Sequence, residues 1–375
     1  MEIKRNILLN PGPATTTDTV KYAQVVPDIC PREKEFGLLT ESVCRDLVKI
    51  AGGDEENYVC ILFGGSGTAG MDAVINSVTP PGKKILIINN GAYGKRMVEI
   101  AKAYAVAPVE LTFDQATLPR VKDVESALRN DPEIACVAIV HHETTTGLLN
   151  PVREIGEMAK QYDKVFIVDA ISSFAGIPAD IKKYDIDFMM STSNKCIQGM
   201  AGVCFVICDK HELEKLKDYP KRSFYLDLYS QYDFFLKSGQ MQFTPPVQTI
   251  YALRRAIDEF LQEGAENRYE RYRKSWETLR NGITEMGFRI LTNPTEESNL
   301  LITILYPEDP DFDFEIMHDR LYEKGFTIYP GKVGKLKSFR LAVLGAVDHH
   351  DINNFLCVFK DILKEMRVRG LTIEN

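Results

Sequence analysis

A lysine and an aspartate in the middle of this chain stand where two side chains could act on one bound molecule. Asp169 ends the apolar run Val165–Asp169, and Lys195 follows the next such run, Phe188–Ser191. They lie 26 positions apart, about one strand–helix–strand step, which can bring groups from adjacent parallel strands into one pocket. Taken singly, the carboxylate could be a helix cap or a metal ligand, and the lysine could be a solvated surface charge.

A glycine-rich turn follows the apolar run Tyr58–Phe63. It reads GGSGT over residues 64–68 and leads into a helical stretch. Small residues let backbone N–H groups approach a phosphate, and a helix start adds unpaired donors and the positive end of a dipole. A simple tight turn is the alternative, and the turn alone favours neither.

The same turn also fits the dinucleotide pattern G-x-G-x-x-G, with Gly65, Gly67 and Gly70. That pattern expects an acidic residue about 20 positions further on, at the end of the next strand, to hold a ribose. The next strand candidate, Lys84–Asn89, leads instead into NGAYG, which has no carboxylate. A nicotinamide dehydrogenase is therefore the weaker interpretation, and the lack of Gly-Lys-Ser/Thr opposes a nucleotide P-loop.

Pyridoxal 5'-phosphate (PLP) chemistry would use the whole set of residues. It requires an amine that binds the cofactor and an acid that keeps the pyridine nitrogen protonated, so that the ring acts as an electron sink. The glycine turn, Tyr93, Thr144, Asp169 and Lys195 each follow a strand candidate. Each is a weak indication alone, but together they predict a PLP site.

The elements that must position these residues alternate between strands and helices. Between about residues 58 and 208, short apolar runs alternate with amphipathic helical stretches. This alternation predicts an α/β fold, with a mainly parallel sheet covered by helices on both faces and ligands beyond the carboxyl ends of the strands. The six strand candidates are Tyr58–Phe63, Lys84–Asn89, Ala135–Val140, Val165–Asp169, Phe188–Ser191 and Val203–Cys208.

A second, smaller strand-and-helix region starts near residue 265. It contains the helical stretch Asn267–Met286 and strand candidates that include Phe288–Leu291, Leu300–Leu305 and Phe339–Leu344. We therefore predict two domains. Residues 1–264 would form an N-terminal arm and a large cofactor-binding domain, and residues 265–375 a small C-terminal domain.

The composition limits the partners. The 45 basic and 53 acidic side chains give a net charge of −8, so we expect no general electrostatic attraction to nucleic acid. The eight cysteines include no CxxC pair, which favours buried thiols in a reducing compartment. We expect a cytoplasmic protein without a membrane segment, since no signal peptide is evident and no apolar stretch approaches the roughly 20 residues that a membrane helix needs.

The motifs resemble those of a known family. The ordered stretches GGSGT, NNGAYG, HHETTTG, VDAISSFAG and STSNKCIQG resemble class V aminotransferases of the fold-type-I PLP superfamily. NPGPATT, HHETTTGLLNP, SNKCIQG, QFTPP and IYPGKV are similar to 2-aminoethylphosphonate–pyruvate transaminases, and the resemblance runs from about residue 6 to 345. It implies the interconversion of 2-aminoethylphosphonate plus pyruvate with phosphonoacetaldehyde plus L-alanine. Another class V transaminase, such as an alanine–glyoxylate or serine–glyoxylate enzyme, is the alternative.

The resemblance also implies roles for individual residues. Lys195 would carry the cofactor and move a proton during the transfer, and Asp169 would pair with the pyridine nitrogen. Tyr93 would stack on the ring, and Thr144, with Thr145, would bind its hydroxyl edge. The cofactor phosphate would be held by Ser66, Gly67, Thr68 and, from the neighbouring subunit, Thr244, so that a homodimer would complete the active site.

The substrate would be recognised through its acidic group. Arg340 would bind it, because a guanidinium fork suits a carboxylate or phosphonate. The family stretch after this arginine usually reads close to R-I-G-x-I-G, whereas here it is RLAVLG, so Ala342 adds a methyl group where backbone could approach the substrate. Arg32 is a candidate second anion contact, with a surface ion pair as the alternative. No metal site is expected, because the adjacent His141 and His142 would point to opposite faces of a strand.

Overall fold

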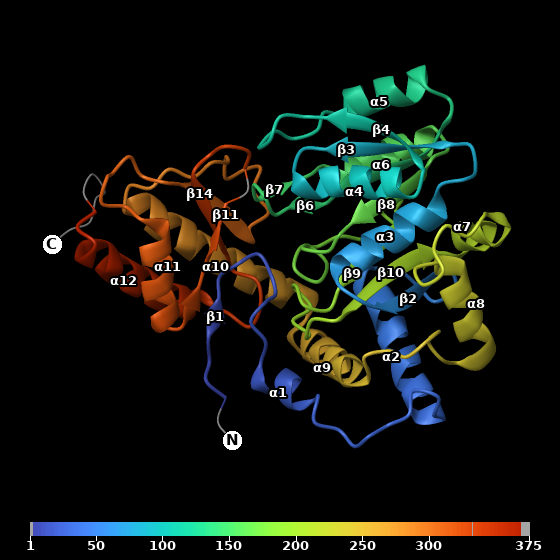
Figure 1. The fold of residues 1–375 in the computed structure, drawn as a ribbon, viewed down its shortest axis with the longest axis horizontal. Coiled ribbons are helices and arrows are strands. Elements are labelled where there is room, and N and C mark those ends of the chain that lie inside the picture. The colour runs from blue at the N-terminus through green and yellow to red at the C-terminus, as the bar shows by residue number, and fades with distance from the viewer. Residues whose placement is uncertain (1–2, 332, 369–375) are drawn as a thin grey trace.

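The computed structural model describes residues 3–331 and 333–368 (Figure 1). Its largest sheet has the strand order β2-β10-β9-β8-β5-β3-β4. β10 is antiparallel to both of its neighbours, whereas all other pairings in this sheet are parallel. The predicted mainly parallel α/β fold is confirmed. The strands are β2 (Tyr58–Gly64), β3 (Lys84–Asn89), β4 (Ala107–Thr112), β5 (Ile134–Val140), β8 (Val165–Asp169), β9 (Phe188–Thr192) and β10 (Val203–Asp209).

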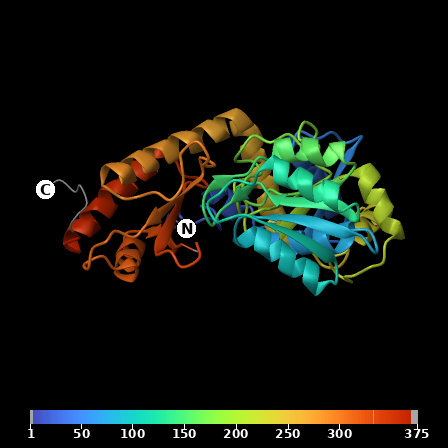
Figure 2. The same ribbon diagram turned by 90° about the horizontal axis from the view of Figure 1, so that it is seen from above.

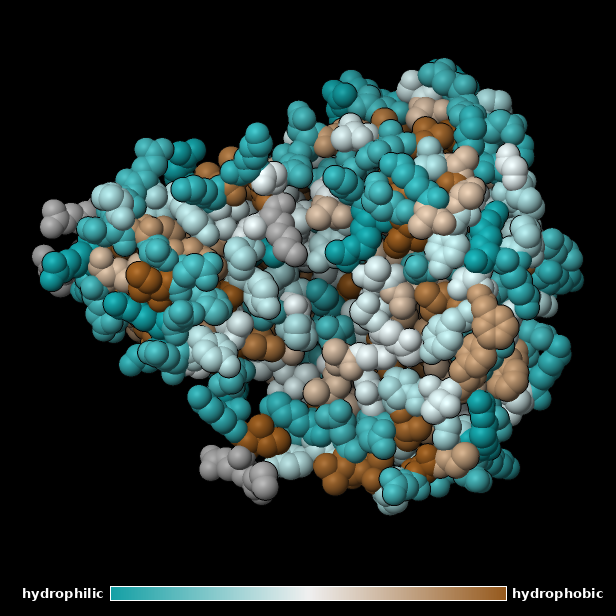
Figure 3. All heavy atoms as spheres, viewed as in Figure 1, coloured by the Kyte–Doolittle hydropathy of each residue, from teal (hydrophilic) through white to brown (hydrophobic). Residues whose placement is uncertain are grey.

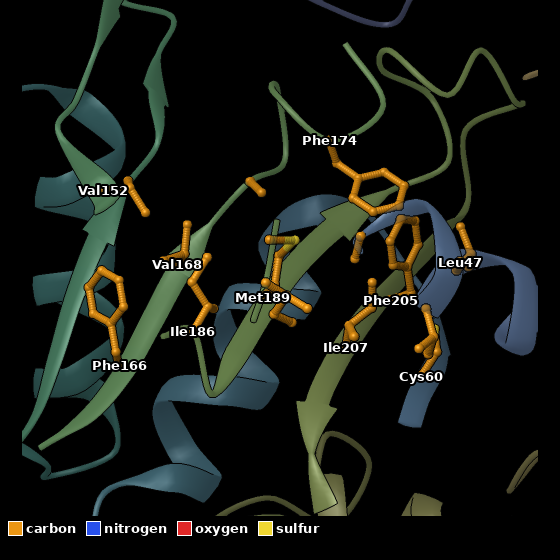
Figure 4. Packing of buried hydrophobic residues seen from close by; sticks show 14 of the residues in the cluster. Leu47, Cys60, Val152, Phe166, Val168, Phe174, Ile186, Met189, Phe205 and Ile207 are labelled. Atoms are coloured by element: carbon orange, nitrogen blue, oxygen red, sulfur yellow. The ribbon is translucent and has the colours of Figure 1, made fainter. Parts of the chain in front are cut away.

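Neighbouring residues of these strands pack into two different hydrophobic cores. Phe166 and Val168 of β8 belong to one core, and Ile167 belongs to the other, because successive side chains of a strand point to opposite faces. Figure 4 shows part of the first core, where Val168, Met189 and Phe205 come from different strands. Burial on both faces explains why the sequence reads as uninterrupted apolar runs.

Helices cover both faces of the sheet (Figures 1 and 2). One core includes residues of α2 (Lys34–Ile50), α5 (Val121–Asn130), α6 (Val152–Gln161) and α9 (Val247–Glu263). The other includes residues of α3 (Gly67–Val78), α4 (Ala92–Ala103), α7 (Lys210–Lys215) and α8 (Leu228–Ser238). The short helix α1 (Asp18–Tyr22) packs against α9.

The C-terminal region builds a third core around the antiparallel sheet β11-β14-β13. Its long helix α10 extends from the large unit along the small one (Figure 2). Gly264 separates α9 from α10, and the domain division at this point stays a prediction. The elements are α10 (Ala265–Glu285), β11 (Leu301–Leu305), α11 (Phe314–Glu323), β13 (Tyr329–Pro330), β14 (Ser338–Ala342) and α12 (His349–Glu365).

The N-terminal arm is part of this C-terminal core. β1 (Ile7–Leu8) pairs in parallel with β12 (Phe326–Thr327), and Leu9 is fully buried in the same core. Residues distant in sequence therefore lie side by side, and the arm passes between the two parts of the molecule.

Two details differ from the prediction. The strand predicted at Phe288–Leu291 is wrong: this segment forms only the isolated bridge between Ile290 and Ile304, and the Phe288 side chain packs edge-on against Phe339, 6.0 Å between ring centroids. β4 was not predicted, because it lies at the edge of the sheet and alternates between exposed and half-buried residues.

The surface in the view of Figure 3 is mostly hydrophilic, with hydrophobic residues in separate groups. In the part of the chain that the structure describes, no helix is long and apolar enough to cross a membrane.

Candidate active site

The carboxyl ends of five strands meet at one edge of the large sheet. β2, β3, β5, β8 and β9 all run in the same direction, since the two antiparallel pairings of β10 cancel. This edge carries most of the predicted site residues: Ser66, Gly67 and Thr68 after β2, Tyr93 after β3, Thr144 and Thr145 after β5, Asp169 at the end of β8, and Lys195 after β9.

Lys195 lies against the N-terminal arm. Its Nζ donates a hydrogen bond to the carbonyl oxygen of Pro11, and the N–H of Ala14 donates to the carbonyl of Asn194 at 2.9 Å. A Cβ atom on Gly12, whose φ is +128°, would lie 2.3 Å from Lys195 Nζ. Only a glycine therefore leaves room for the lysine at this point of the arm.

Burial lowers the pKa of Lys195 to about 8. The cations Arg340 and Arg96 act in the same direction, while Cys196 and Asp169 oppose the shift. An amine is a nucleophile only when it is unprotonated, so a lowered pKa prepares Lys195 to react near neutral pH.

Asp169 is a buried carboxylate at the end of β8. It is 3% exposed, and its Oδ1 accepts a hydrogen bond from the N–H of Ile171 at 2.8 Å. Burial raises its pKa to about 7, and the nearby Glu143 adds to the effect, while Lys195 opposes it. A protonated pyridine nitrogen would supply a positive partner here, so this carboxylate fits the ring of PLP.

The start of α3 fits the phosphate of the same cofactor. The hydroxyl of Ser66, its N-cap residue, makes no hydrogen bond to the helix, and the first N–H groups of a helix have no partner within it. A Cβ on Gly67 would lie 2.9 Å from Ile171 Cδ1, so a larger residue at this position would push the Ile171 side chain aside.

Glu143 is a site residue that sequence reasoning missed. Its side chain is fully buried and accepts hydrogen bonds from the N–H of Tyr93 at 3.2 Å, and from the N–H and hydroxyl of Thr145 at 3.1 and 2.5 Å. A Cβ on Gly91 would lie 2.3 Å from its Cδ. The carboxylate therefore ties together the turns that carry Tyr93 and Thr145. The available signal was the charged residue within the threonine-rich stretch HHETTTG, directly after the apolar run that ends at Val140.

Arg96 was missed as well. Its guanidinium lies 4.8 Å from the centroid of the Tyr93 ring and donates a hydrogen bond to the Thr68 hydroxyl at 3.0 Å. It thereby connects the predicted stacking residue with the predicted phosphate site. The signal was its position one helical turn after Tyr93, on the same face of α4.

Arg340 comes from β14 and reaches the large sheet. It is 3% exposed and donates hydrogen bonds to the carbonyl of Thr144 at 3.0 Å and to the carbonyl of Pro330 through two nitrogens. These bonds use three of its five N–H groups and leave two for an anion. The structure thus brings Arg340 next to the turn that carries Thr144 and Thr145. Burial lowers the pKa of Arg340.

Arg32 and Thr244 lie together but apart from this network. Arg32 donates hydrogen bonds to Gln240 Oε1 at 3.3 Å and to the carbonyls of Met241 and Phe243 at 2.8 and 2.9 Å. It holds the segment that ends in Thr244, which is exposed on this chain. The roles of Arg32 at the substrate and of Thr244 at a partner's cofactor stay predictions.

The two adjacent histidines have different partners. The ring of His141 bonds to the Ser173 hydroxyl at 3.0 Å, and that of His142 to the Ser298 hydroxyl at 2.9 Å. Burial lowers their pKa values to about 4 and about 3, so both are neutral at physiological pH. Among residues 3–331 and 333–368, no three histidine, cysteine or acidic side chains gather as metal ligands.

The sequence profile of the class V aminotransferases matches residues 22–311. The chain belongs to this family. It is 40% identical to the 2-aminoethylphosphonate–pyruvate transaminase of Bacillus thuringiensis over 352 residues, which are 93% of this chain and 96% of that protein. It is 39% identical to the bifunctional phosphonoacetaldehyde hydrolase/aminoethylphosphonate transaminase of Clostridioides difficile, over 95% of this chain and 56% of that longer protein. The resemblance predicted from the motifs is confirmed.

The fold of the class V aminotransferases is also found among solved structures. Ureidoglycine–glyoxylate aminotransferase from Bacillus subtilis superposes with a TM-score of 0.90 over 100% of this chain and 97% of that chain. The sequences are 23% identical, so this likeness shows the shared fold.

Proposed function

We propose that this class V aminotransferase uses PLP to transfer an amino group between 2-aminoethylphosphonate and pyruvate, with phosphonoacetaldehyde and L-alanine as the products, in either direction. The observation that carries the proposal is Lys195 beside the buried Asp169, with the buried Arg340 bound to the neighbouring turn. The names of the similar proteins supply the substrates.

Each residue of the pair has a distinct task in this proposal. PLP, when bound, supplies an electron sink for the bonds at the substrate carbon that carries nitrogen. Lys195 would take a proton from that carbon of the amino donor and, in the second half of the reaction, give one to the corresponding carbon of the keto acid, which requires an amine with a pKa near the working pH. Asp169 keeps a proton on the ring nitrogen through its charge and burial.

Arg340 would select substrates by their acidic end. Phosphonate and carboxylate both accept two parallel hydrogen bonds from a guanidinium, so one arginine can serve 2-aminoethylphosphonate and L-alanine in turn. The backbone carbonyls of Thr144 and Pro330 fix its orientation before a substrate arrives. We further propose a homodimer, in which Thr244 of one subunit contacts the cofactor phosphate of the other.

The test is a half-reaction on purified protein loaded with PLP. Adding 2-aminoethylphosphonate without a keto acid should remove the visible absorbance of the bound cofactor, and pyruvate should restore it. L-Alanine, the amino donor of the reverse reaction, should cause the same loss of visible absorbance. If L-alanine reacts and 2-aminoethylphosphonate does not, the phosphonate substrate is wrong; if PLP produces no visible band at all, the assignment of Lys195 is wrong.

A further inference from the structure

Asn10 is a buried side chain with an unpaired acceptor. It is 2% exposed, and its Oδ1 accepts no hydrogen bond from any of the described residues 3–331 and 333–368. Its Nδ2 donates to the carbonyl of Pro13 at 3.3 Å. An unpaired buried acceptor is costly and uncommon, so its presence calls for a specific explanation.

The position of Asn10 supplies that explanation. The carbonyl of Leu9 accepts a hydrogen bond from the N–H of Ala342 at 2.8 Å, two positions after Arg340 on β14. The carbonyl of Pro11 accepts one from Lys195 Nζ. Because one residue spans at most about 3.6 Å, the backbone of Asn10 lies within a few ångströms of the strand that carries Arg340 on one side and of Lys195 on the other.

We propose that Asn10 is a substrate-positioning residue, whose carboxamide oxygen accepts a hydrogen bond from the ammonium group of the amino substrate. This inference rests on the proposed function. 2-Aminoethylphosphonate and L-alanine both carry an anion for Arg340 and an ammonium group that must approach Lys195. An amide oxygen is an acceptor, so it pairs with the ammonium group and not with an ionised phosphonate or carboxylate.

This assignment separates the two kinds of substrate. Pyruvate has an anionic end but no N–H group, so it gains nothing from the Asn10 oxygen. If the Asn10 side chain bound the anion through its NH₂ group instead, pyruvate would depend on it as much as the amino substrates do. If Asn10 were only structural, its replacement would change the binding of neither the amino substrates nor pyruvate.

The experiment compares Asn10→Leu and Asn10→Ala with wild-type enzyme and with the control Ser230→Ala. Ser230 Oγ is also buried without a described partner, but it lies on α8, away from Lys195. We expect the Asn10 variants to weaken the binding of 2-aminoethylphosphonate and L-alanine by about 10- to 100-fold, as for one hydrogen bond to a charged group. The KM for pyruvate and the affinity for PLP should stay within about twofold, and Ser230→Ala should match wild type in all of them.

Thermal unfolding of the cofactor-free variants gives a readout that is independent of activity. Replacing Asn10 by leucine removes a buried unpaired acceptor together with one long hydrogen bond to Pro13, so Tm should change little, and a loss of substrate binding at unchanged Tm supports the proposal. The proposal would be overturned if the Asn10 variants bound both amino substrates as tightly as wild type, or if their KM for pyruvate rose by the same factor. A wild-type enzyme that reacts with neither amine would overturn the proposed function together with this role.

Discussion

At the scale of single residues, burial and neighbouring charges decide which groups can react. Lys195 sits in a protein environment that disfavours its charged form, and Asp169 in one that disfavours its own. Lys195 can therefore offer an unprotonated amine to a cofactor, and Asp169 can share a proton with it. Such opposed shifts within one site are typical of acid–base chemistry.

Removing the amine tests the central role most directly. Lys195→Ala should abolish turnover, because the loss of the proton transfer alone costs about 10²- to 10⁴-fold and the covalent link to the cofactor disappears too. The phosphate contacts at the start of α3 should still retain some PLP. Steady-state assays and the absorbance of the dialysed protein measure both effects, and wild-type activity in this variant would refute the assignment.

The pH dependence of cofactor uptake reports on the lowered pKa of Lys195. Only the unprotonated amine can bind PLP covalently. Because burial lowers its pKa from 10.5 to about 8, the uptake rate should rise with pH and level off a little above pH 8. Rapid-mixing absorbance on cofactor-free protein measures this profile. A midpoint near the ordinary lysine value would mean that the site does not shift the amine.

Arg340 should act on substrate binding more than on the cofactor. Arg340→Ala removes charge-assisted hydrogen bonds, each worth about 1.5–3 kcal/mol, so KM for 2-aminoethylphosphonate should rise at least about tenfold. Arg340→Lys keeps the charge but loses the planar fork, and an intermediate effect is expected. Steady-state kinetics with both variants test this. An unchanged KM in Arg340→Ala would remove the residue from the substrate site.

At the scale of elements, the sequence was informative where the local pattern determines the structure. The central strands were predictable because both faces are buried, which leaves long apolar runs such as Ile134–Val140. β4 was not predictable, because it is an edge strand that contains Pro108 and several exposed residues, so its sequence lacks a long apolar run. Glu143 and Arg96 were missed for another reason: each has one partner on another loop, Tyr93 for Glu143 and Thr68 for Arg96, and only the folded chain brings these residues together.

The arm offers a test of how one element positions another. Gly12→Ala would place a methyl group 2.3 Å from Lys195 Nζ, so the lysine or the arm must move. We expect slower PLP uptake and lower turnover, with a Tm loss of a few degrees. Gly82→Ala is the matched control, since Gly82 also has a positive φ (+74°) but no atom within 4 Å of the position that a Cβ would take. An equal loss of turnover in the two variants would show that backbone strain, and not contact with Lys195, causes the loss.

At the scale of the whole molecule, the site depends on parts of the chain that are far apart in sequence. The arm is anchored in the C-terminal core through Ile7 and Leu9, and it touches Lys195 through Pro11. Arg340 comes from that same core and contacts the loop of Thr144. The relative position of the two parts therefore sets the distance between Lys195 and Arg340, and a change at the junction of the two parts should alter the surroundings of both side chains.

The surface around Thr244 shows where a second subunit could complete the site. Phe224 is 86% exposed, and its ring lies 5.7 Å from that of Phe243, which stacks on Tyr225 and precedes Thr244. An aromatic group this exposed is costly in water and suits a subunit interface. Phe224→Asp should therefore weaken the proposed homodimer and, with it, the retention of PLP. Sedimentation and cofactor titration over a range of protein concentrations would measure both, with Ile316→Asp on α11 as the control. If the wild-type protein were monomeric and still bound PLP and turned over substrate, Thr244 of a second subunit would not be needed. No neighbouring chain would then be present to supply it.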